Sequence, residues 1–303
     1  MLHGVTNRLS LLGEGDYEID STRSAISLPR TKAFPKNIEF DVMLTFSGTP
    51  SGSLISSVTP TPESITLNQH HSFIALPDLN YKPRLFDPRS GANALTFYDY
   101  TTPVSRSTKK QYLLRHRLIK KNPSAASSEA VEPIIYYLDN GTPEPVRSAL
   151  IEGGMWWNEA FENIGFKNAF QIKMLPEGAD PLDVRYNVIQ WVHRSTRGWS
   201  YGSSVIDPRT GEIIKGHVTL GSLRIRQDFM IALGLIDQPF LEDNNKENIA
   251  LEMALSRIRQ LSAHEIGHTL GFAHNFTASA NLRSSVMDYP HPNITFRNGE
   301  ISI

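Results

Sequence analysis

The stretch that decides the fold is HEIGHTLGFAH, residues 264–274, in which three histidines stand at positions 264, 268 and 274. Residues four apart on an α-helix lie on one face about a turn apart, so His264 and His268 can present their imidazoles to one point. Gly271 can adopt a left-handed conformation that ends the helix and turns the chain back. This turn would bring His274 to the same point as a third imidazole.

These donors predict a catalytic zinc centre. Three neutral imidazole nitrogens and a water suit a tetrahedral zinc with one open position. Glu265 lies one step round the helix, off the metal but within reach of a metal-bound water, which is the position of a general base. A short H-E-x-x-H also occurs by chance, but the extended motif fixes five positions and so disfavours chance or a purely structural role. We expect one Zn²⁺ held by His264, His268 and His274.

A second motif follows the helix. Residues 285–290 read SVMDYP, which places Met287 thirteen positions after His274. The two motifs together resemble those of the metzincin metalloproteases, whose zinc helix is followed by a tight turn with a methionine beneath the metal. The resemblance implies that the three histidines are the metal ligands, that Glu265 is the base and that Met287 is the Met-turn residue.

The tyrosine of this turn has two possible roles. The pattern S-x-M-x-Y, from Ser285 to Tyr289, is similar to the turn of the astacin and serralysin branches, where a tyrosine can approach the zinc and stabilise the oxyanion. The resemblance implies a catalytic role for Tyr289, whose phenol is able to donate a hydrogen bond to a developing negative charge. The alternative is an aromatic residue packed beside Pro290. Asp288 is expected to make a turn hydrogen bond rather than a metal bond.

The resemblance extends beyond the motifs. The stretches at 70–91, 191–229 and 274–290 are similar to the large bacterial zinc-dependent metalloproteases with an uncharacterised N-terminal β region. Those proteins are longer and usually carry an export signal, which implies an extracytoplasmic location, periplasmic or secreted. The first twenty residues do not read as a signal peptide. We therefore expect a central piece of a longer protein, truncated at the C-terminus of its catalytic domain.

The function expected from these features is that of a zinc-dependent metalloendopeptidase. It would hydrolyse peptide bonds of a protein or peptide substrate through a zinc-bound water activated by Glu265. One alternative is a catalytically idle binding module that retains zinc for its structure, although such a module has no need of the glutamate. Another is a zinc hydrolase that cuts an amide in a non-peptide substrate, because the zinc chemistry would be the same.

Composition excludes other classes. The chain has 303 residues with a formal net charge of −1, so nothing indicates a nucleic-acid surface. Cysteine is absent, which excludes disulfides, cysteine–zinc sites and a thiol nucleophile. No apolar run approaches the roughly 20 residues that a membrane span needs. No pattern in the sequence indicates an oligomeric state.

The fold class expected is α+β, with two domains. Residues 1–125 form a β-rich accessory or pro-like domain, with strands at 36–48 and 63–78, and residues 126–303 form the metzincin-like α/β catalytic domain. A small, polar, proline-bracketed stretch at 120–133 predicts the linker between them. The catalytic domain is expected to contain a mixed sheet and three helices, at 142–166, 223–235 and 249–271, of which the first begins near Thr142 and backs the sheet, and the last carries the site.

The substrate strand is the last prediction. In metzincins the substrate pairs antiparallel with an edge strand above the zinc helix, and the best candidate is GHVTLGS, residues 216–222. An edge strand has free backbone groups that can bind an extended peptide by strand addition. The alternative is an ordinary buried strand. The residues expected to bind substrate are Gly216, His217, Val218, Thr219 and Leu220.

Overall fold

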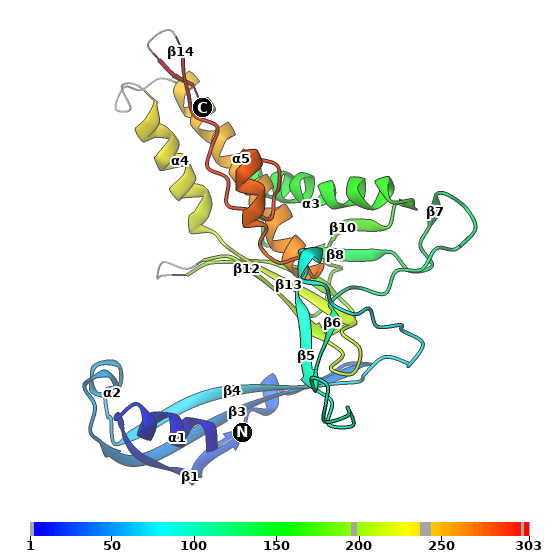
Figure 1. The fold of residues 1–303 in the computed structure, drawn as a ribbon. Helices are drawn as coiled ribbons and strands as arrows, with labels where there is room; N and C mark the ends of the chain where they lie inside the picture. Colours follow the sequence, from blue (N-terminus) through cyan, green and yellow to red (C-terminus); the bar gives the residue numbers. More distant parts are fainter. Residues whose placement is uncertain (1–2, 195–198, 237–243, 298–299, 303) are drawn as a thin grey trace. The chain divides into compact units, whose positions relative to one another are not determined.

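The computed structural model describes residues 3–194, 199–236, 244–297 and 300–302. The chain forms two compact units (Figure 1). Unit 1 comprises Met1–Ala75 with Leu182–Val184, and unit 2 comprises Leu76–Pro181 with Arg185–Ile303. The α+β fold class is confirmed, with a β-rich N-terminal region and a C-terminal region of helices and sheet.

Unit 1 is an antiparallel sheet whose central strand is β3 (Asn37–Pro50). β3 pairs with β1 (Gly15–Ile26), β4 (Ser64–Ile74) and the short β2 (Lys32–Ala33). The unit also contains α1 (His3–Leu11), α2 (Ser53–Val58) and a 3₁₀ turn at Leu28–Arg30. Its buried core consists of Tyr17, Leu44, Phe46, Ile55 and Ile65. The two predicted strands are present, whereas α1 was not predicted.

The main sheet of unit 2 has five strands in the order β10-β8-β11-β13-β12. β8 (Ile134–Leu138), β10 (Phe170–Met174), β11 (Asn187–Val192) and β13 (Ile213–Gly221) run parallel, and β12 (Tyr201–Ile206) pairs antiparallel with β13. Parallel strands are covered by helices, so β8 reads as an almost continuous apolar run. The four parallel strands contribute buried residues to one core, as Tyr136, Phe170, Ile189 and Val218 show.

Helices α3 and α5 cover this sheet on one side, and α4 packs against α5 (Figure 1). α4 spans Leu223–Leu235, as predicted, and α5 spans Asn244–Thr269. α3 spans Val146–Asn163 and begins after Pro145, later than the start expected near Thr142. Leu150 of α3 and Ile258 and Ile266 of α5 are buried in the same core. The core of unit 2 therefore anchors α5, which carries His264 and His268.

The prediction that residues 216–222 form a free edge is wrong. β13 is hydrogen-bonded on both sides, to β11 through the register His217–Val188 and to β12 through the register His217–Ser203. Its backbone groups are therefore used within the sheet and are not free for an added strand. Among the described residues, β12 is the antiparallel strand at this end of the sheet.

Shorter elements complete unit 2. They are the hairpin β5 (Ala94–Tyr98) and β6 (Lys109–Leu113), the pair β7 (Ser128–Glu129) and β9 (Phe166–Lys167), the pair β14 (Thr295–Arg297) and β15 (Glu300–Ser302), and 3₁₀ turns at Pro88–Ser90 and Phe276–Asn281. The stretch expected to be a linker contains β7, and Lys120 Nζ donates hydrogen bonds to the carbonyls of Ala125 and Ala126 at 3.1 and 2.8 Å. The compact units divide after residue 75. A two-domain division at residue 125 stays a prediction.

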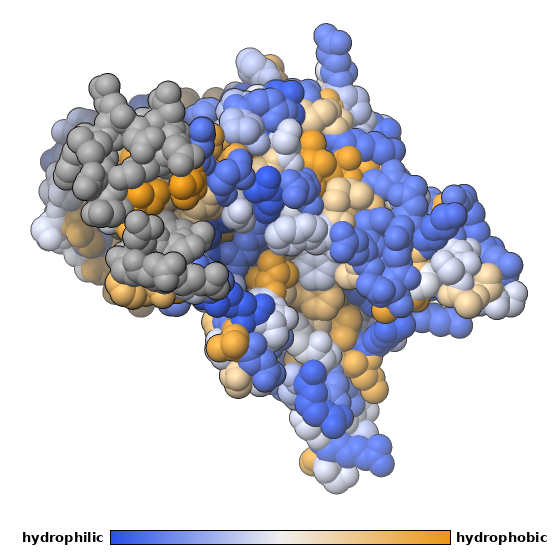
Figure 2. All heavy atoms as spheres, turned by 90° about the horizontal axis from the view of Figure 1, so that it is seen from above, coloured by the Kyte–Doolittle hydropathy of each residue, from blue (hydrophilic) through white to orange (hydrophobic). Residues whose placement is uncertain are grey.

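The surface is mixed in character. Figure 2 shows mostly hydrophilic side chains, with hydrophobic ones in small groups among them. Scattered exposed apolar residues are normal on proteins, because polar atoms do not cover the whole surface. In the part of the chain that the structure describes, no helix combines the length and apolar character of a membrane span.

Candidate metal centre

The first two histidines lie on one face of α5. His264 and His268 are a turn apart, with ring centroids 4.7 Å from each other. Ile266 lies on the opposite face, fully buried in the core, and Leu270 is 7% exposed. This apolar stripe fixes the rotation of the helix, so both imidazoles face away from the sheet.

A Schellman motif ends the helix and turns the chain. Phe272 N donates to Gly267 O at 3.0 Å and Gly271 N donates to His268 O at 3.1 Å, which is the hydrogen-bond pair of that motif. Gly271 has φ +103°, and a Cβ on it would lie 2.3 Å from the carbonyl oxygen of Leu114. Backbone conformation and space therefore both require glycine at this position.

The turn brings the third histidine to the first two. His268 Nε2 lies 3.2 Å from His264 Nε2 and 3.1 Å from His274 Nε2. One ligand atom from each ring lies within 4.8 Å of the others. The tertiary structure therefore brings together all three histidines of the motif.

Backbone carbonyls set the tautomers of the two helix histidines. His264 Nδ1 donates to Val286 O at 2.7 Å, and His268 Nδ1 donates to Phe272 O at 2.9 Å. A carbonyl oxygen only accepts, so in each neutral ring the hydrogen is on Nδ1 and Nε2 keeps its lone pair. Lone pairs that converge at about 3 Å repel one another, and a cation placed among them turns this repulsion into coordination.

The donor set fits zinc. Burial lowers the pKa of His264 and of His274, which favours the neutral imidazole that metal binding requires. Three imidazoles with orienting carbonyls form the ligand set of a zinc site that keeps an open position. We infer that His264, His268 and His274 would hold the ion.

The methionine turn lies directly against the zinc helix. Met287 is buried at 5% exposure, and a Cβ on Gly267 would lie 2.3 Å from its sulfur, so the glycine leaves the space that the thioether fills. Asn275 N donates to Met287 O at 2.9 Å, which ties the turn to the chain just after His274. The preceding carbonyl, of Val286, is the one that orients His264.

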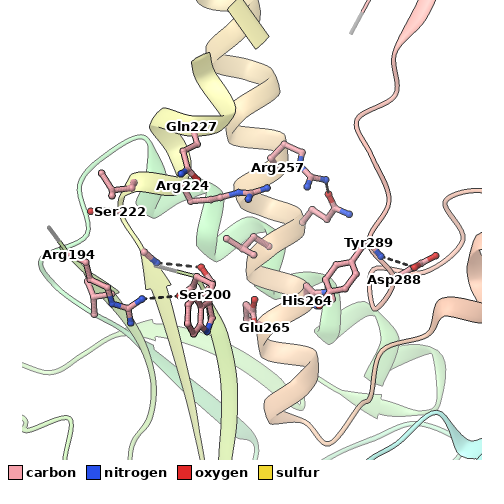
Figure 3. Close-up of a pocket in the computed structure, with 16 residues that line it drawn as sticks. Arg194, Ser200, Ser222, Arg224, Gln227, Arg257, His264, Glu265, Asp288 and Tyr289 are labelled. Carbon is pink, nitrogen blue, oxygen red and sulfur yellow. Dashed lines mark hydrogen bonds between the residues drawn. The ribbon is translucent and has the colours of Figure 1, made fainter. Parts of the chain in front are cut away.

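Glu265 follows His264 on α5, and both residues line a cavity of about 520 Å³ (Figure 3). Glu265 is only 6% exposed. Burial raises the pKa of this carboxyl to about 7, and a hydrogen bond from the backbone N–H of Gly202 on β12 opposes that rise. A carboxyl group with a pKa near neutrality can both accept and return a proton.

Tyr289 stands over the centre. Its hydroxyl lies 2.7 Å from His274 Nε2, and its ring is stacked 5.3 Å from the ring of His264. The residue is 61% exposed, so its ring is not enclosed in a core. Asp288 makes the expected turn hydrogen bonds, accepting from Ser279 Oγ and from Tyr289 N.

The predicted substrate residues, by contrast, lie away from this cavity. None of residues 216–220 lines it, whereas the next two residues, Gly221 and Ser222, do. His217 is directed to Gln190, with its Nε2 3.2 Å from the amide oxygen.

Several residues that support the centre were not predicted. Asn93 N donates to Gly271 O at 2.7 Å and Ala273 N donates to Gly91 O at 2.9 Å, so residues 91–93 run along the turn that carries His274. No local signal in 91–93 reveals this contact, because the two segments are far apart in sequence.

A buried polar network lies behind the same turn. Tyr136 Oη donates to Thr269 Oγ1 at 2.7 Å, and Thr269 Oγ1 donates to Ile266 O at 2.7 Å. His116 donates to the backbone carbonyl of Thr269. Trp157 stacks on Phe272, with centroids 5.1 Å apart. These contacts hold the last turn of α5 and the residues that follow it.

Comparison with known families bears on the same segment. Residues 246–303 match the family model described as Met-zincin, and residues 4–121 match the model described as a domain of unknown function (DUF5117). No curated protein and no solved structure matches the chain. The resemblance to the metzincins is confirmed over the segment that carries the zinc helix and the Met-turn. This match and the three-histidine cluster together support a metzincin-type metalloprotease in general.

Proposed function

We propose that this protein is a zinc-dependent endopeptidase that hydrolyses peptide bonds. The observation that carries the proposal is the convergence of the Nε2 atoms of His264, His268 and His274, with the buried Glu265 next to His264 on the same helix. A structural zinc site does not need such a carboxyl next to its ligands.

The three histidines would hold the ion. When bound, zinc supplies a Lewis acid that lowers the pKa of a coordinated water toward about 7 and polarises a carbonyl oxygen. The carbonyls of Val286 and Phe272 keep the rings of His264 and His268 oriented for this role by accepting from Nδ1.

Glu265 is the proton carrier in this proposal. Its carboxylate accepts a proton from the attacking water and passes it to the nitrogen of the departing amine. A pKa of about 7 suits both transfers at neutral pH. The buried position of the carboxyl keeps bulk water from competing for the proton.

Tyr289 is proposed as a donor to the negative charge that develops on the substrate carbonyl oxygen. Its hydroxyl already lies at the ligand set, 2.7 Å from His274 Nε2. The exposure of the ring leaves it room to move aside as substrate enters. A hydrogen bond of this kind is stronger in the transition state than in the ground state.

We propose that an extended peptide adds to β12 rather than to β13. β12 is the antiparallel strand at the end of the sheet, and Gly202 on it lies against the backbone of Glu265. Strand addition there would lay the peptide beside the base. The location in the cell, periplasmic or secreted, and the division into an accessory domain 1–125 and a catalytic domain 126–303 are also proposals, based on the resemblance.

The test is hydrolysis of casein by the full chain, with zinc content measured in parallel. We expect one zinc per chain and activity that a chelator removes and added zinc restores. Glu265→Gln should keep the zinc and lose roughly 100-fold or more in kcat, the size of a general acid–base contribution. Exposed Glu159 on α3 offers a matched control, Glu159→Gln, with unchanged activity. Full activity in Glu265→Gln would defeat the proposal.

A further inference from the structure

Three arginines line the cavity beside Glu265. Arg224 comes from α4 and Arg257 from α5, and both line the cavity that Glu265 and His264 also line (Figure 3). Arg194 lines it as well, with Nη1 donating to Trp199 O at 2.9 Å. A guanidinium group stays charged at any physiological pH.

The two helix arginines are not equally neutralised. Arg224 forms a salt bridge with the buried Asp228, Nε to Oδ2 at 3.0 Å. Arg257 has no carboxylate within salt-bridge distance among the described residues. Its hydrogen bonds there run from Nη1 alone, to Gln260 Oε1 and to Pro290 O. Among the residues that the structure describes, Arg257 therefore has no salt bridge, and its N–H groups on Nε and Nη2 make no hydrogen bond.

The surroundings make this charge costly in the free protein. Burial lowers the pKa of Arg257, Asp228 opposes that effect, and the neighbouring Arg224 lowers the pKa further. The acidic residues of the cavity do not compensate. Asp288 accepts hydrogen bonds from Ser279 and from Tyr289 N, and among the described residues neither Asp288 nor Glu265 forms a salt bridge with Arg257. An anion that enters the cavity would relieve this imbalance.

We propose that Arg257, assisted by Arg224, binds a carboxylate of the peptide substrate and so selects peptides that present a carboxylate near the scissile bond. The proposal rests on the proposed peptidase function, because it takes the ligand to be part of a peptide. One cavity contains both the base and the guanidinium groups, so a peptide held at Glu265 places a flanking group among the arginines. A guanidinium binds a carboxylate through two parallel hydrogen bonds, which neither an amide nor an apolar side chain can form.

Two sources of that carboxylate are possible, an Asp or Glu side chain near the scissile bond or the free C-terminus of the peptide. The probes are three pools of fluorescent decapeptides, random except at one fixed internal position. The first pool has Glu there and an amidated end, the second has Gln and an amidated end, and the third has Gln and a free terminal carboxylate. Binding is measured with zinc-loaded Glu265→Gln, which does not turn the peptides over, and cleavage with the unaltered protein.

We expect the first or the third pool to bind about tenfold or more tightly than the second, a difference of about 1.4 kcal/mol. Arg257→Gln should remove this preference, and Arg257→Lys should retain part of it, because the charge remains while the paired hydrogen bonds are lost. Arg224→Gln should have a smaller effect, because Asp228 already neutralises Arg224. Exposed Arg226, on the same helix, provides the control Arg226→Gln, which should behave as the unaltered protein does.

The two proposals fail in different ways. Equal binding of all three pools, or a preference that survives both Arg257→Gln and Arg224→Gln, would overturn the carboxylate site whether or not peptides are cleaved. A carboxylate preference in binding, with no cleavage by the zinc-loaded protein, would overturn the peptidase and leave the carboxylate site standing. Zinc content and thermal midpoint of each variant show whether Arg257→Gln has disturbed the fold through Pro290. If Arg257→Gln is misfolded, the preferences of Arg257→Lys and Arg224→Gln among the three peptide pools provide the test.

Discussion

The backbone nitrogen of Asn93 lies 2.7 Å from the carbonyl oxygen of Gly271 and donates a hydrogen bond to it. Gly271 belongs to the segment that matches the Met-zincin model, and Asn93 belongs to the segment that matches the domain of unknown function. The turn that brings His274 to the metal centre is therefore held by a part of the chain that lies outside the motif. Both residues are in unit 2.

This relationship predicts a strong effect of substitution at Gly271. Gly271→Ala places a Cβ 2.3 Å from Leu114 O at a residue with φ +103°. We expect a loss of at least about 2–3 kcal/mol in the free energy of unfolding, because the backbone strain at residue 271 and the displacement of Leu114 both destabilise the folded state. Zinc affinity should fall as well, since His274 follows the turn. Urea unfolding and zinc titration measure the two effects.

The control is another glycine. Gly234→Ala in α4 meets nothing within 4 Å. Alanine is the better helix former, so this change should leave zinc affinity unaltered and stabilise the protein by up to about 1 kcal/mol. Equal behaviour of the two variants would show that the turn at Gly271 does not have the geometry described.

Stability should depend on pH through His116. Burial lowers the pKa of this imidazole to about 4, below the ordinary value of 6.5, and a hydrogen bond to the Thr269 carbonyl only partly offsets the shift. Between these two values the unfolded chain binds more protons than the folded one, so stability rises with pH. The contribution is fully present above pH 6.5 and is lost as pH falls toward about 4. Its size is on the order of 3 kcal/mol.

The variant His116→Gln isolates this contribution. Its free energy of unfolding should vary less between pH 7 and pH 4.5 than that of the unaltered protein, by roughly 2–3 kcal/mol. Urea unfolding of the metal-free proteins at both pH values gives the comparison, because the other titrating groups are common to both. Parallel pH profiles would contradict the lowered pKa of His116.

Zinc removal should lower thermal stability, since the ion binds the folded chain only. At a free zinc concentration of about 1,000 times Kd the stabilisation is about 4 kcal/mol. For a unit of this size that corresponds to a fall of roughly 8–16 °C in Tm on chelation. His274→Gln lacks one of the three imidazoles, so a chelator should change its Tm little. A chelator-sensitive Tm in that variant would mean that zinc is held elsewhere.

Removing the hydroxyl of Tyr289 should affect turnover more than binding. Tyr289→Phe keeps the ring that stacks on His264 and loses the group that lies 2.7 Å from His274 Nε2. We expect kcat to fall roughly 100-fold with KM nearly unchanged, because the lost hydrogen bond is made in the transition state. Zinc content should stay the same. Tyr98→Phe, at an exposed tyrosine of β5, is the control, and an equal loss in both variants would argue against the role of Tyr289.

The local features of the site could be read from the residues alone. His264 and His268 share a face because of the helical repeat, and Gly271 ends the helix because it tolerates a positive φ. Helix α4 was predicted with its bounds, Leu223–Leu235, since its pattern and its limits are local. The start of α3 was placed too early, because turn residues and proline mark an end only to within a few positions.

Other features depend on contacts between distant segments. The place of β13 inside the sheet is set by its pairing with β11 and β12. The sequence of an apolar strand does not show whether its backbone groups are paired on one side or on both. No motif marks residues 91–93, Leu114 and His116. Their role comes from their contacts with the end of α5 and the turn after it, which lie far away in the sequence. Arg257 is one arginine among many in the sequence. It lies on the same helix as Glu265, and the packing of α4 against α5 adds Arg224 to the cavity that both residues line.

The sequence by itself determined the ligand set, the base and the methionine turn, because their geometry follows from helical spacing and one glycine within a short stretch of chain. The tertiary structure decided which strand has a free edge, which distant residues hold the third histidine, and which charges surround the base. These depend on register and helix packing, where long-range contacts choose among arrangements that local residues leave equally open.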